Sequence, residues 1–439
     1  MPPHAERLRL CFAQGPLTSR QLVERLQISQ PTVSRAVAML GEEIVRLGAG
    51  RAIQYALRDS GRGLANIPVY RVSVDGTLRQ FGLLTPVRPD GFVMRQENGV
   101  TVHCDGLPWW LLDMRPQGFL GQIYAEHHAV ALGLPSRLSE WSDTHVLRAL
   151  VAHGEDVVGN LLLGDIARDR FINAPPSVSV DRTQYPALAE AAERGDLPGS
   201  SAGGEQPKFL AFTDRHVLVK FTSAAADNPV ARRWRDLLVA EHSAARVLHV
   251  AGVPASNARL LDFAGRRFLE VERFDRVGNL GRRAAHSLSS LDAEFVGEAN
   301  QPWPLLAARL AAQGTITAEA AAGATLLYAF GTLIGNSDMH NGNLSFVSEH
   351  GRPYQLAPAY DMLPMAFAPR SGGALPGRLP AARLHPGVPP QAWRQALALA
   401  DAFIGAMNDD RRLSDDWEPC NDALKWHSED ARVKIGRLG

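Results

Sequence analysis

Cysteine is scarce in this chain of 439 residues. Its three cysteines, Cys11, Cys104 and Cys420, lie far apart and are odd in number. This pattern excludes a disulfide framework and a zinc site built on cysteine spacing, and it is typical of a reducing compartment. The chain also lacks a signal-peptide pattern and any apolar run near the roughly 20 residues of a membrane span. We therefore expect a cytoplasmic protein without membrane contact.

Net charge is absent as well. The 46 basic residues balance the 46 acidic residues, and charged residues make up 21% of the chain. Composition thus indicates a soluble globular protein and gives no sign of a polyanionic partner for the chain as a whole. The length suffices for about two to four domains.

Residues 1–60 begin with a pattern that predicts a helix-turn-helix. A first helix is expected after a cap at Thr18 or Ser19, because Leu22 and Leu26 then share one helical face. After a short turn, a second helix is expected over Gln30–Leu40, with Ser29 as its cap.

A two-stranded wing is predicted next, because residues 44–57 alternate around a glycine-bearing tip. The whole pattern is similar to the winged helix-turn-helix of bacterial repressors, in which the second helix enters the major groove. Residues 1–60 hold eight arginines and five acids, a net charge of +3 that suits DNA. Winged helices also mediate protein–protein contacts, so both functions stay open. The candidate DNA-binding residues are Thr32, Ser34, Arg35, Arg46 and Arg51.

A small β-rich subdomain is predicted over residues 68–165. Short alternating segments indicate strands, and Asp75-Gly76 is typical of a hairpin turn between two of them. A helical part follows from Gly121 to about Val151 and contains His127-His128. These histidines have no acidic or cysteine partner at ligand spacing, so we expect ordinary helix residues rather than metal ligands.

A phosphate-binding segment is predicted around two lysines. Ser200–Lys208 is a glycine-bearing loop whose small residues would let backbone N–H groups approach phosphate oxygens. It matches neither the Walker pattern nor the kinase glycine loop, and such runs are often linkers. Lys220 lies in the apolar strand His216–Phe221, like the strand lysine that contacts nucleotide phosphates in kinases. A solvent-facing lysine is the alternative.

Two further segments fit a kinase small lobe. A helix is expected over Arg232–Val250, and Glu241 lies on it where an acid would pair with the strand lysine. Phe268–Arg276 is an apolar strand with a charged end. In a bilobal kinase this strand leads into the hinge, so Glu272 to Phe274 lie where backbone groups would bond the adenine edge.

The most informative pattern is an acid, an amide five positions later, and a second acid beyond a short hairpin: Asp338, Asn343 and Asp361. Kinases use this order for a base that orients the attacking hydroxyl and for two ligands of magnesium. A predicted hairpin over residues 344–357 returns the chain, so Asp361 can face the same metal as Asn343. Loops are rich in these residue types in any case.

Together these residues resemble the HipA family of bacterial toxin kinases over residues 68–439. The resemblance implies a β-rich subdomain at 68–165 and a bilobal protein-kinase-like domain at 180–439. With the winged helix-turn-helix predicted at 1–60, we expect an α+β protein. The kinase-like domain would have a hinge near 272–275 and a helical C-terminal lobe. The matching segments are Ser201–Lys208, Lys220, Val271–Arg276, Asp338–Asn343 and Tyr360-Asp361.

The resemblance implies roles at the catalytic end. Asp338 would be the catalytic base, Asn343 and Asp361 would bind Mg²⁺, and His340 would lie beside the nucleotide.

It also implies roles at the other end of the site. Lys208 and Lys220 would contact ATP phosphates, and the backbone of Glu272 and Phe274 would hold adenine. Ser201 matches the serine that family members phosphorylate on themselves, which ejects the phosphate loop and silences the kinase.

The implied activity is that of an ATP-dependent serine/threonine protein kinase toxin. Family members of known action phosphorylate an aminoacyl-tRNA synthetase, so a protein substrate from translation and an antitoxin are the expected partners. This chain departs from the family in carrying its own predicted DNA-binding head, so the role of the head stays open. A small-molecule phosphotransferase of the aminoglycoside kinase-like type and a nucleotide-sensing transcription regulator are the alternatives.

Overall fold

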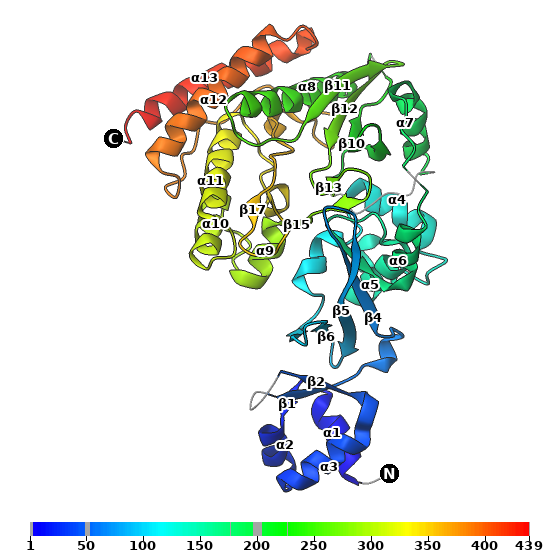
Figure 1. The fold of residues 1–439 in the computed structure, drawn as a ribbon. Helices are drawn as coiled ribbons and strands as arrows, with labels where there is room; N and C mark the ends of the chain where they lie inside the picture. The colour runs from blue at the N-terminus through cyan, green and yellow to red at the C-terminus, as the bar shows by residue number, and fades with distance from the viewer. Residues whose placement is uncertain (1–2, 49–52, 176, 196–203, 226, 439) are drawn as a thin grey trace.

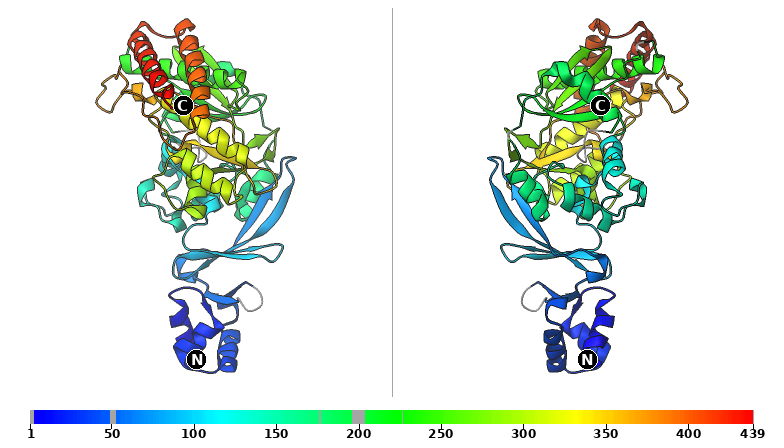
Figure 2. Two further views of the ribbon diagram at one scale, coloured as in Figure 1. Left: turned by 90° about the vertical axis from the view of Figure 1, so that its left-hand side faces the viewer. Right: turned by 90° about the vertical axis from the view of Figure 1, so that its right-hand side faces the viewer.

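The computed structural model describes residues 3–48, 53–175, 177–195, 204–225 and 227–438. The molecule is elongated. Its N-terminal part lies at one end, the next part of the chain follows it, and the two remaining parts lie beside each other at the far end (Figures 1 and 2). We call these parts the head (residues 3–62), the middle domain (64–172), the small lobe (180–275) and the large lobe (276–438). Over the described residues, no helix combines the length and apolarity needed to cross a membrane.

The head consists of helices around a small antiparallel sheet of strand order β1-β3-β2. The two helices expected from sequence are present. Thr18 caps the first of them, because its hydroxyl accepts the N–H of Gln21 at 3.2 Å. Ser29 stands at the cap position of the second but makes no side-chain cap, and its hydroxyl pairs with that of Thr32 instead. The elements are α1 (Pro3–Phe12), β1 (Leu17–Thr18), α2 (Ser19–Leu26), α3 (Gln30–Leu40), β2 (Ile44–Leu47) and β3 (Gln54–Leu57).

The middle domain is a five-stranded antiparallel sheet of order β7-β6-β5-β4-β8 with helices on both faces. The predicted turn at Asp75-Gly76 is present, and Gly76 adopts φ +82°, which favours glycine. The expected helical stretch 121–151 is divided into two helices. The elements are β4 (Ile67–Val72), β5 (Leu78–Val87), β6 (Gly91–Gln96), β7 (Thr101–Cys104), α4 (Gly118–His128), α5 (Asp143–His153), β8 (Leu161–Leu163) and α6 (Gly164–Ile172).

The head docks on the middle domain through its strands. A small apolar cluster joins the two parts, and the N–H of Arg88 donates to the carbonyl of Leu57 at 2.9 Å. Helices α2 and α3 therefore face away from the rest of the molecule, at the lower end in Figure 1. The cluster consists of Leu47, Ala56, Val87 and Val93.

The small lobe is a four-stranded antiparallel sheet of order β11-β12-β10-β9, with helix α8 packed on β11 and β12. The aromatic rings of Tyr185, Phe209, Phe221 and Phe268 fill the core between α7 and the sheet. The elements are α7 (Tyr185–Glu193), β9 (Lys208–Phe212), β10 (His216–Phe221), α8 (Pro229–Val250), β11 (Ala258–Phe263) and β12 (Arg266–Glu272).

The large lobe is helical and contains the largest hydrophobic core. Apolar side chains of the Ala-rich helix α11 are buried there, with Phe330 and Leu333 fully inaccessible. The chain leaves this helix directly into the Asp338 loop. The elements are β13 (Arg276–Val277), β14 (Gly281–Arg282), β15 (Ala284–Ser287), α9 (Leu288–Phe295), α10 (Trp303–Ala312), α11 (Ala318–Leu333), β16 (Ser345–Ser348), β17 (Gln355–Leu356), α12 (Pro390–Asp409) and α13 (Glu418–Ile435).

Candidate functional site

A cavity of about 420 Å³ lies where the small lobe, the large lobe and the middle domain meet. We call it the central cavity. Most of the candidate residues from both ends of the expected kinase site line it. They are Lys208, Lys220, Glu272, Phe274, His340, Asn343 and Asp361.

A buried charge cluster closes one end of the central cavity. Lys220 is only 7% exposed, and its Nζ donates to both carboxylate oxygens of Glu241, at 2.6 and 2.8 Å. Nζ also contacts the carboxylate of Asp361. The solvent-facing alternative for this lysine is therefore wrong. The acid expected on α8 is indeed its partner.

These charges shift one another's proton affinity. Burial alone would lower the pKa of Lys220, but Asp361 and Glu241 raise it above its ordinary value. Burial raises the pKa of Glu241. Burial also acts to raise the pKa of Asp361, yet the Lys220 ammonium keeps it below the ordinary value. At neutral pH the cluster therefore holds a protonated lysine.

Lys208 adds a second positive charge beside the first. It is the direct cross-strand neighbour of Lys220 in the β9–β10 pair, and it is 3% exposed. Its Nζ donates to the carbonyl of Gly204 at 2.9 Å, and burial lowers its pKa to about 8. Like charges directly opposite each other destabilise a sheet. Two buried lysines facing one cavity are thus suited to an anion with several charges.

The loop that carries Asp338 is held by amide side chains. Asn336 is 4% exposed, and its Oδ1 accepts the N–H of Asp338 at 3.0 Å while its Nδ2 donates to the carbonyl of Asp361 at 3.2 Å. Asn343 donates through Nδ2 to the carbonyl of Asp338 at 2.7 Å. Two asparagines therefore fix the Asp338 loop, and one of them ties it to Asp361. Asp338 itself is exposed and lies outside the lining of the central cavity.

Asp361 has a strained backbone. Its φ is +53°, a left-handed value that is uncommon for residues other than glycine and costs about 1 kcal/mol or more. The bond from Asn336 to its carbonyl and the contact of its carboxylate with Lys220 hold this conformation. Such strain is frequent at functional sites.

The hinge segment forms the opposite wall. The ring of Phe274 stacks on that of Tyr360, with centroids 5.6 Å apart. The Tyr360 hydroxyl donates to the carbonyl of Gly342 at 3.0 Å. Among the residues that the structure describes, the backbone N–H of Phe274 has no acceptor. A flat ligand with an acceptor atom at its edge would satisfy this N–H.

The donor set fits magnesium bound with a nucleotide. Since Nδ2 of Asn343 is engaged with Asp338, its Oδ1 remains as the metal-facing atom, and Asp361 supplies carboxylate oxygen. Mg²⁺ usually takes one or two carboxylates together with substrate phosphates and water. Within the described part of the chain, no group of three or more His, Cys, Asp or Glu side chains forms a self-sufficient metal cage.

Two of the remaining candidate residues are outside the described part of the chain, and the other four belong to the head. Ser201 and Arg51 fall outside the described residues. On α3, Ser34 and Arg35 are exposed and Thr32 is half-buried, and Arg46 is exposed on β2. They are far from the central cavity, at the other end of the molecule.

Sequence reasoning missed Asn336 and four residues of the middle domain that line the central cavity. One local feature could have indicated Asn336. It lies two residues before Asp338, and an asparagine side chain at this spacing can accept the backbone N–H of Asp338. The middle-domain residues had none, because only tertiary packing brings them to the cavity. They are Leu112, Asp113, Gln117 and Val158.

Comparison with known proteins agrees with this architecture. The HipA-like C-terminal domain matches residues 200–415, and the YjjJ-like toxin middle domain matches residues 64–172. The chain is 38% identical over 437 residues to Toxin YjjJ of Escherichia coli (strain K12), covering 97% of this chain and 98% of that protein.

Two solved structures are similar to this chain to different degrees. A chain from the Shewanella oneidensis MR-1 complex of HipA, HipB and operator DNA matches with a TM-score of 0.52 and 15% identity, over 85% of this chain and 97% of that chain. The Helicobacter pylori proinflammatory kinase CtkA matches with a TM-score of 0.36 and 15% identity, over 53% of this chain and 90% of that chain.

The fold is thus α+β with a HipA-like C-terminal region. The chain belongs to the family of HipA-like toxins, as its resemblance predicted.

The charge cluster can be tested by stability. Lys220→Met leaves Glu241 and Asp361 buried together, so we expect a loss of about 3–5 kcal/mol of unfolding free energy at pH 8. In the variant the pKa of Glu241 is raised further, because its positive partner is gone. As the pH falls toward about 5.5, the folded variant takes up a proton at this carboxylate, so the loss of unfolding free energy becomes smaller. Urea denaturation of both proteins at the two pH values measures this. Lys425→Met, at an exposed helical pair with Asp422, is the control and should change little. An equal loss at both pH values would contradict the expectation.

Proposed function

We propose that the chain is a magnesium-dependent kinase that transfers the γ-phosphoryl group of ATP to a serine or threonine of a protein. The observation that carries the proposal is that two buried lysines, Lys208 and Lys220, line one cavity together with Asn343 and Asp361. Positive charge for phosphates and oxygen ligands for magnesium are the two requirements of phosphoryl transfer.

Each part of the cavity has a separate task. The two lysines balance phosphate charge, and the free N–H of Phe274 bonds the adenine edge. Asn343 and Asp361 would hold the ion, which would supply positive charge that offsets the charge of the phosphates during transfer. Glu241 keeps Lys220 in place.

Asp338 acts on the acceptor. Its carboxylate takes the proton of the attacking hydroxyl while the oxygen–phosphorus bond forms and the bond to the leaving ADP breaks. Asn336 orients this residue through its backbone N–H. The exposure of Asp338 favours an acceptor on a large molecule, because a small acceptor would need walls around it.

The relatives suggest partners for this activity. The Shewanella complex contains HipB and operator DNA, and the Escherichia coli relative is a toxin. We infer a growth-arresting kinase with an antitoxin partner and a target in translation, such as an aminoacyl-tRNA synthetase. Ser201 is the proposed self-phosphorylation site, since Gly204 of the same loop touches Lys208.

Phosphoryl transfer is tested with the purified chain, ATP and Mg²⁺. Asp338→Ala should lower protein labelling by about 10²–10⁴-fold, because the acceptor proton loses its base. Mass spectrometry of the chain and of a cell extract locates the phosphate, which we expect on Ser201 and on one main target protein. Asp422→Ala, at an exposed site on α13, is the matched control and should label normally.

Two results would contradict this. Labelling that persists in Asp338→Ala would exclude the assigned base. Phosphate on a sugar or amine with no labelled protein would favour a small-molecule phosphotransferase instead.

The pH dependence of ATP affinity tests Lys208. Its pKa of about 8 means that the empty site loses this charge as the pH rises, whereas bound phosphate needs the charged form. The dissociation constant should therefore increase above pH 8, by up to about tenfold per pH unit. Calorimetric titration from pH 7 to 9.5 measures it. Lys208→Met should bind more weakly and show no such slope. A flat profile in the wild type would refute the role of Lys208.

We further propose that the head binds DNA. The observation in its favour is that the first turns of α3 are exposed on the end of the molecule opposite to the middle domain. Docking through the strands leaves this surface accessible, as a recognition helix requires.

A gel-shift assay with the DNA that flanks the gene tests the head. Arg35→Ala should weaken binding by about 5–150-fold, as expected for a base or phosphate contact. Arg20→Ala removes an exposed arginine of α2 that pairs with Glu24, and should have little effect. If the wild type binds this DNA only at low salt concentration and loses binding at moderate salt concentration, specific recognition is contradicted.

A further inference from the structure

The middle domain contacts the central cavity at three separate chain segments. Kinase-like sites are usually described as two lobes that close on a nucleotide. Here a third body touches both lobes, and it also supplies four of the lining residues. The three contacts involve the hinge, the segment that carries Lys208, and the start of α9.

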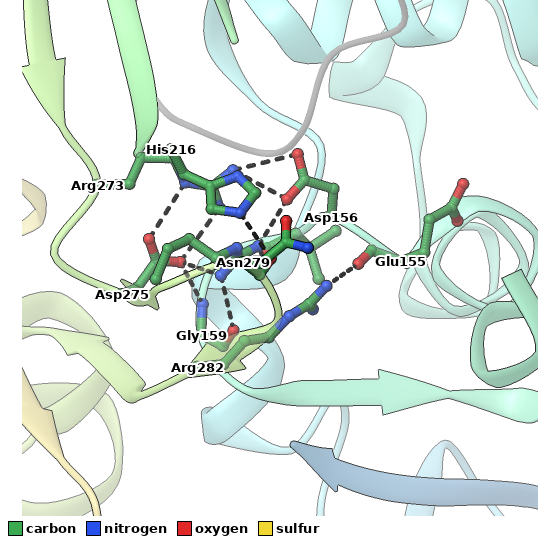
Figure 3. A network of polar contacts seen from close by, with 10 residues as sticks. Glu155, Asp156, Gly159, His216, Arg273, Asp275, Asn279 and Arg282 are labelled. Atoms are coloured by element: carbon green, nitrogen blue, oxygen red, sulfur yellow. Dashed lines mark hydrogen bonds and ion pairs between the residues drawn. The ribbon is translucent and has the colours of Figure 1, made fainter. Parts of the chain in front are cut away.

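The first contact lies behind the hinge (Figure 3). Arg273 donates through Nη1 to both carboxylate oxygens of Asp156, at 2.9 and 3.1 Å, and Arg276 donates to the same carboxylate at 2.8 Å. Asp275 accepts the backbone N–H of Gly159 at 3.0 Å. The side chains of Arg273, Asp275 and Arg276 are 4–8% exposed, so water cannot stabilise their charges. They are stabilised by one another and by Asp156 of the middle domain.

This network fixes the backbone that the nucleotide would use. Phe274, whose N–H is free, lies between Arg273 and Asp275, and both neighbours are anchored on the middle domain. Loss of Asp156 would leave two buried guanidinium groups with a single acid, Asp275. The hinge would then have to rearrange to hydrate them.

The second contact is with the phosphate loop. The carbonyl of Gly204 accepts the N–H of Phe119, at 3.0 Å, and the Nζ of Lys208, at 2.9 Å. The start of α4 and a phosphate-facing lysine therefore share one acceptor. Gly118 has φ +59°, and a Cβ atom there would lie 2.6 Å from the oxygen of Gly204. Only glycine allows this close approach.

The third contact is with the large lobe. Asp113 accepts the backbone N–H of Ser287 at 2.7 Å and its hydroxyl at 2.6 Å. Ser287 in turn caps α9, since its Oγ accepts the N–H of Ser290 at 3.1 Å. Asp113 and both serines line the central cavity.

We propose that the middle domain is a clamp of the nucleotide site, with Asp156 as the positioning residue of the hinge. Its docking holds the hinge, the segment from Gly204 to Lys208 and the start of α9 in the arrangement that would bind an adenine nucleotide with magnesium. The inference rests on the proposed kinase function. By linkage, a nucleotide that needs this arrangement also strengthens the docking.

The test uses the full-length chain and MgATP as the probe. Asp156→Asn keeps the size of the side chain and removes its charge. We expect the dissociation constant of MgATP and the KM for ATP to rise about tenfold or more. The decrease in kcat should be smaller. Asp165→Asn is the matched control, because its hydrogen-bond partners among the described residues, Tyr70 and Arg168, both belong to the middle domain. It should stay within about twofold of the wild type.

A second readout separates the clamp from simple structural support. MgATP should slow amide hydrogen exchange at Gly159, which donates to Asp275 from the middle domain. A domain that served only as a scaffold would show no such change. Circular dichroism and thermal unfolding establish that each variant is folded.

If Asp156→Asn does not fold, Gly118→Ala serves instead, because its Cβ displaces only the Gly204 end of the phosphate loop. A folded Asp156→Asn, or Gly118→Ala in its place, that binds MgATP like the wild type would overturn the clamp while leaving the kinase proposal intact. A wild type that binds no MgATP would overturn the proposed function itself.

Discussion

The buried ammonium of Lys220 is the interaction on which the site depends. A single charge this far from water would be strongly unfavourable, so the fold has to deliver counter-charges to it. Glu241 comes from a helix and Asp361 from a segment more than a hundred residues further along the chain. Satisfying one lysine therefore fixes the sheet, α8 and the large lobe relative to one another. The cavity between them follows from that arrangement.

The strain at Asp361 is a consequence of the same requirement. Its carboxylate has to reach Lys220 while its carbonyl faces Asn336, and a left-handed backbone meets both conditions. Asn336 then transmits the position of Asp361 to the N–H of Asp338. The residue proposed to bind metal and the residue proposed to take the proton are thus joined by one buried amide. Neither can move far without breaking a hydrogen bond to the buried side chain of Asn336.

Much of this was predictable from sequence, for identifiable reasons. Lys220 and Asn343 lie in short segments whose strand or loop character is local, and spacing alone placed them. Helix α1 was not predicted. Ala5, Leu8 and Phe12 share its buried face, but Leu10, which is 73% exposed, lies off that face and obscures the pattern. Asp113 and Asp156 gave no signal, since their partners lie 174 and 117 residues away. Local sequence patterns cannot predict such pairs, because only the tertiary packing of the chain brings the two residues together.

The sheet of the middle domain connects the two ends of the molecule. At one end of strand β5, Val87 packs against the strands of the head. At the other, the turn before it receives a hydrogen bond from the N–H of Arg282 to the carbonyl of Ser73, at 3.0 Å. Arg282 also donates to the carbonyl of Glu155, next to Asp156 in the network of Figure 3. One continuous strand thus runs from the head to the back of the hinge. This strand separates the exposed helix α3 from the central cavity, so that a ligand bound at one does not obstruct the other. The positions of both are therefore set by the middle domain.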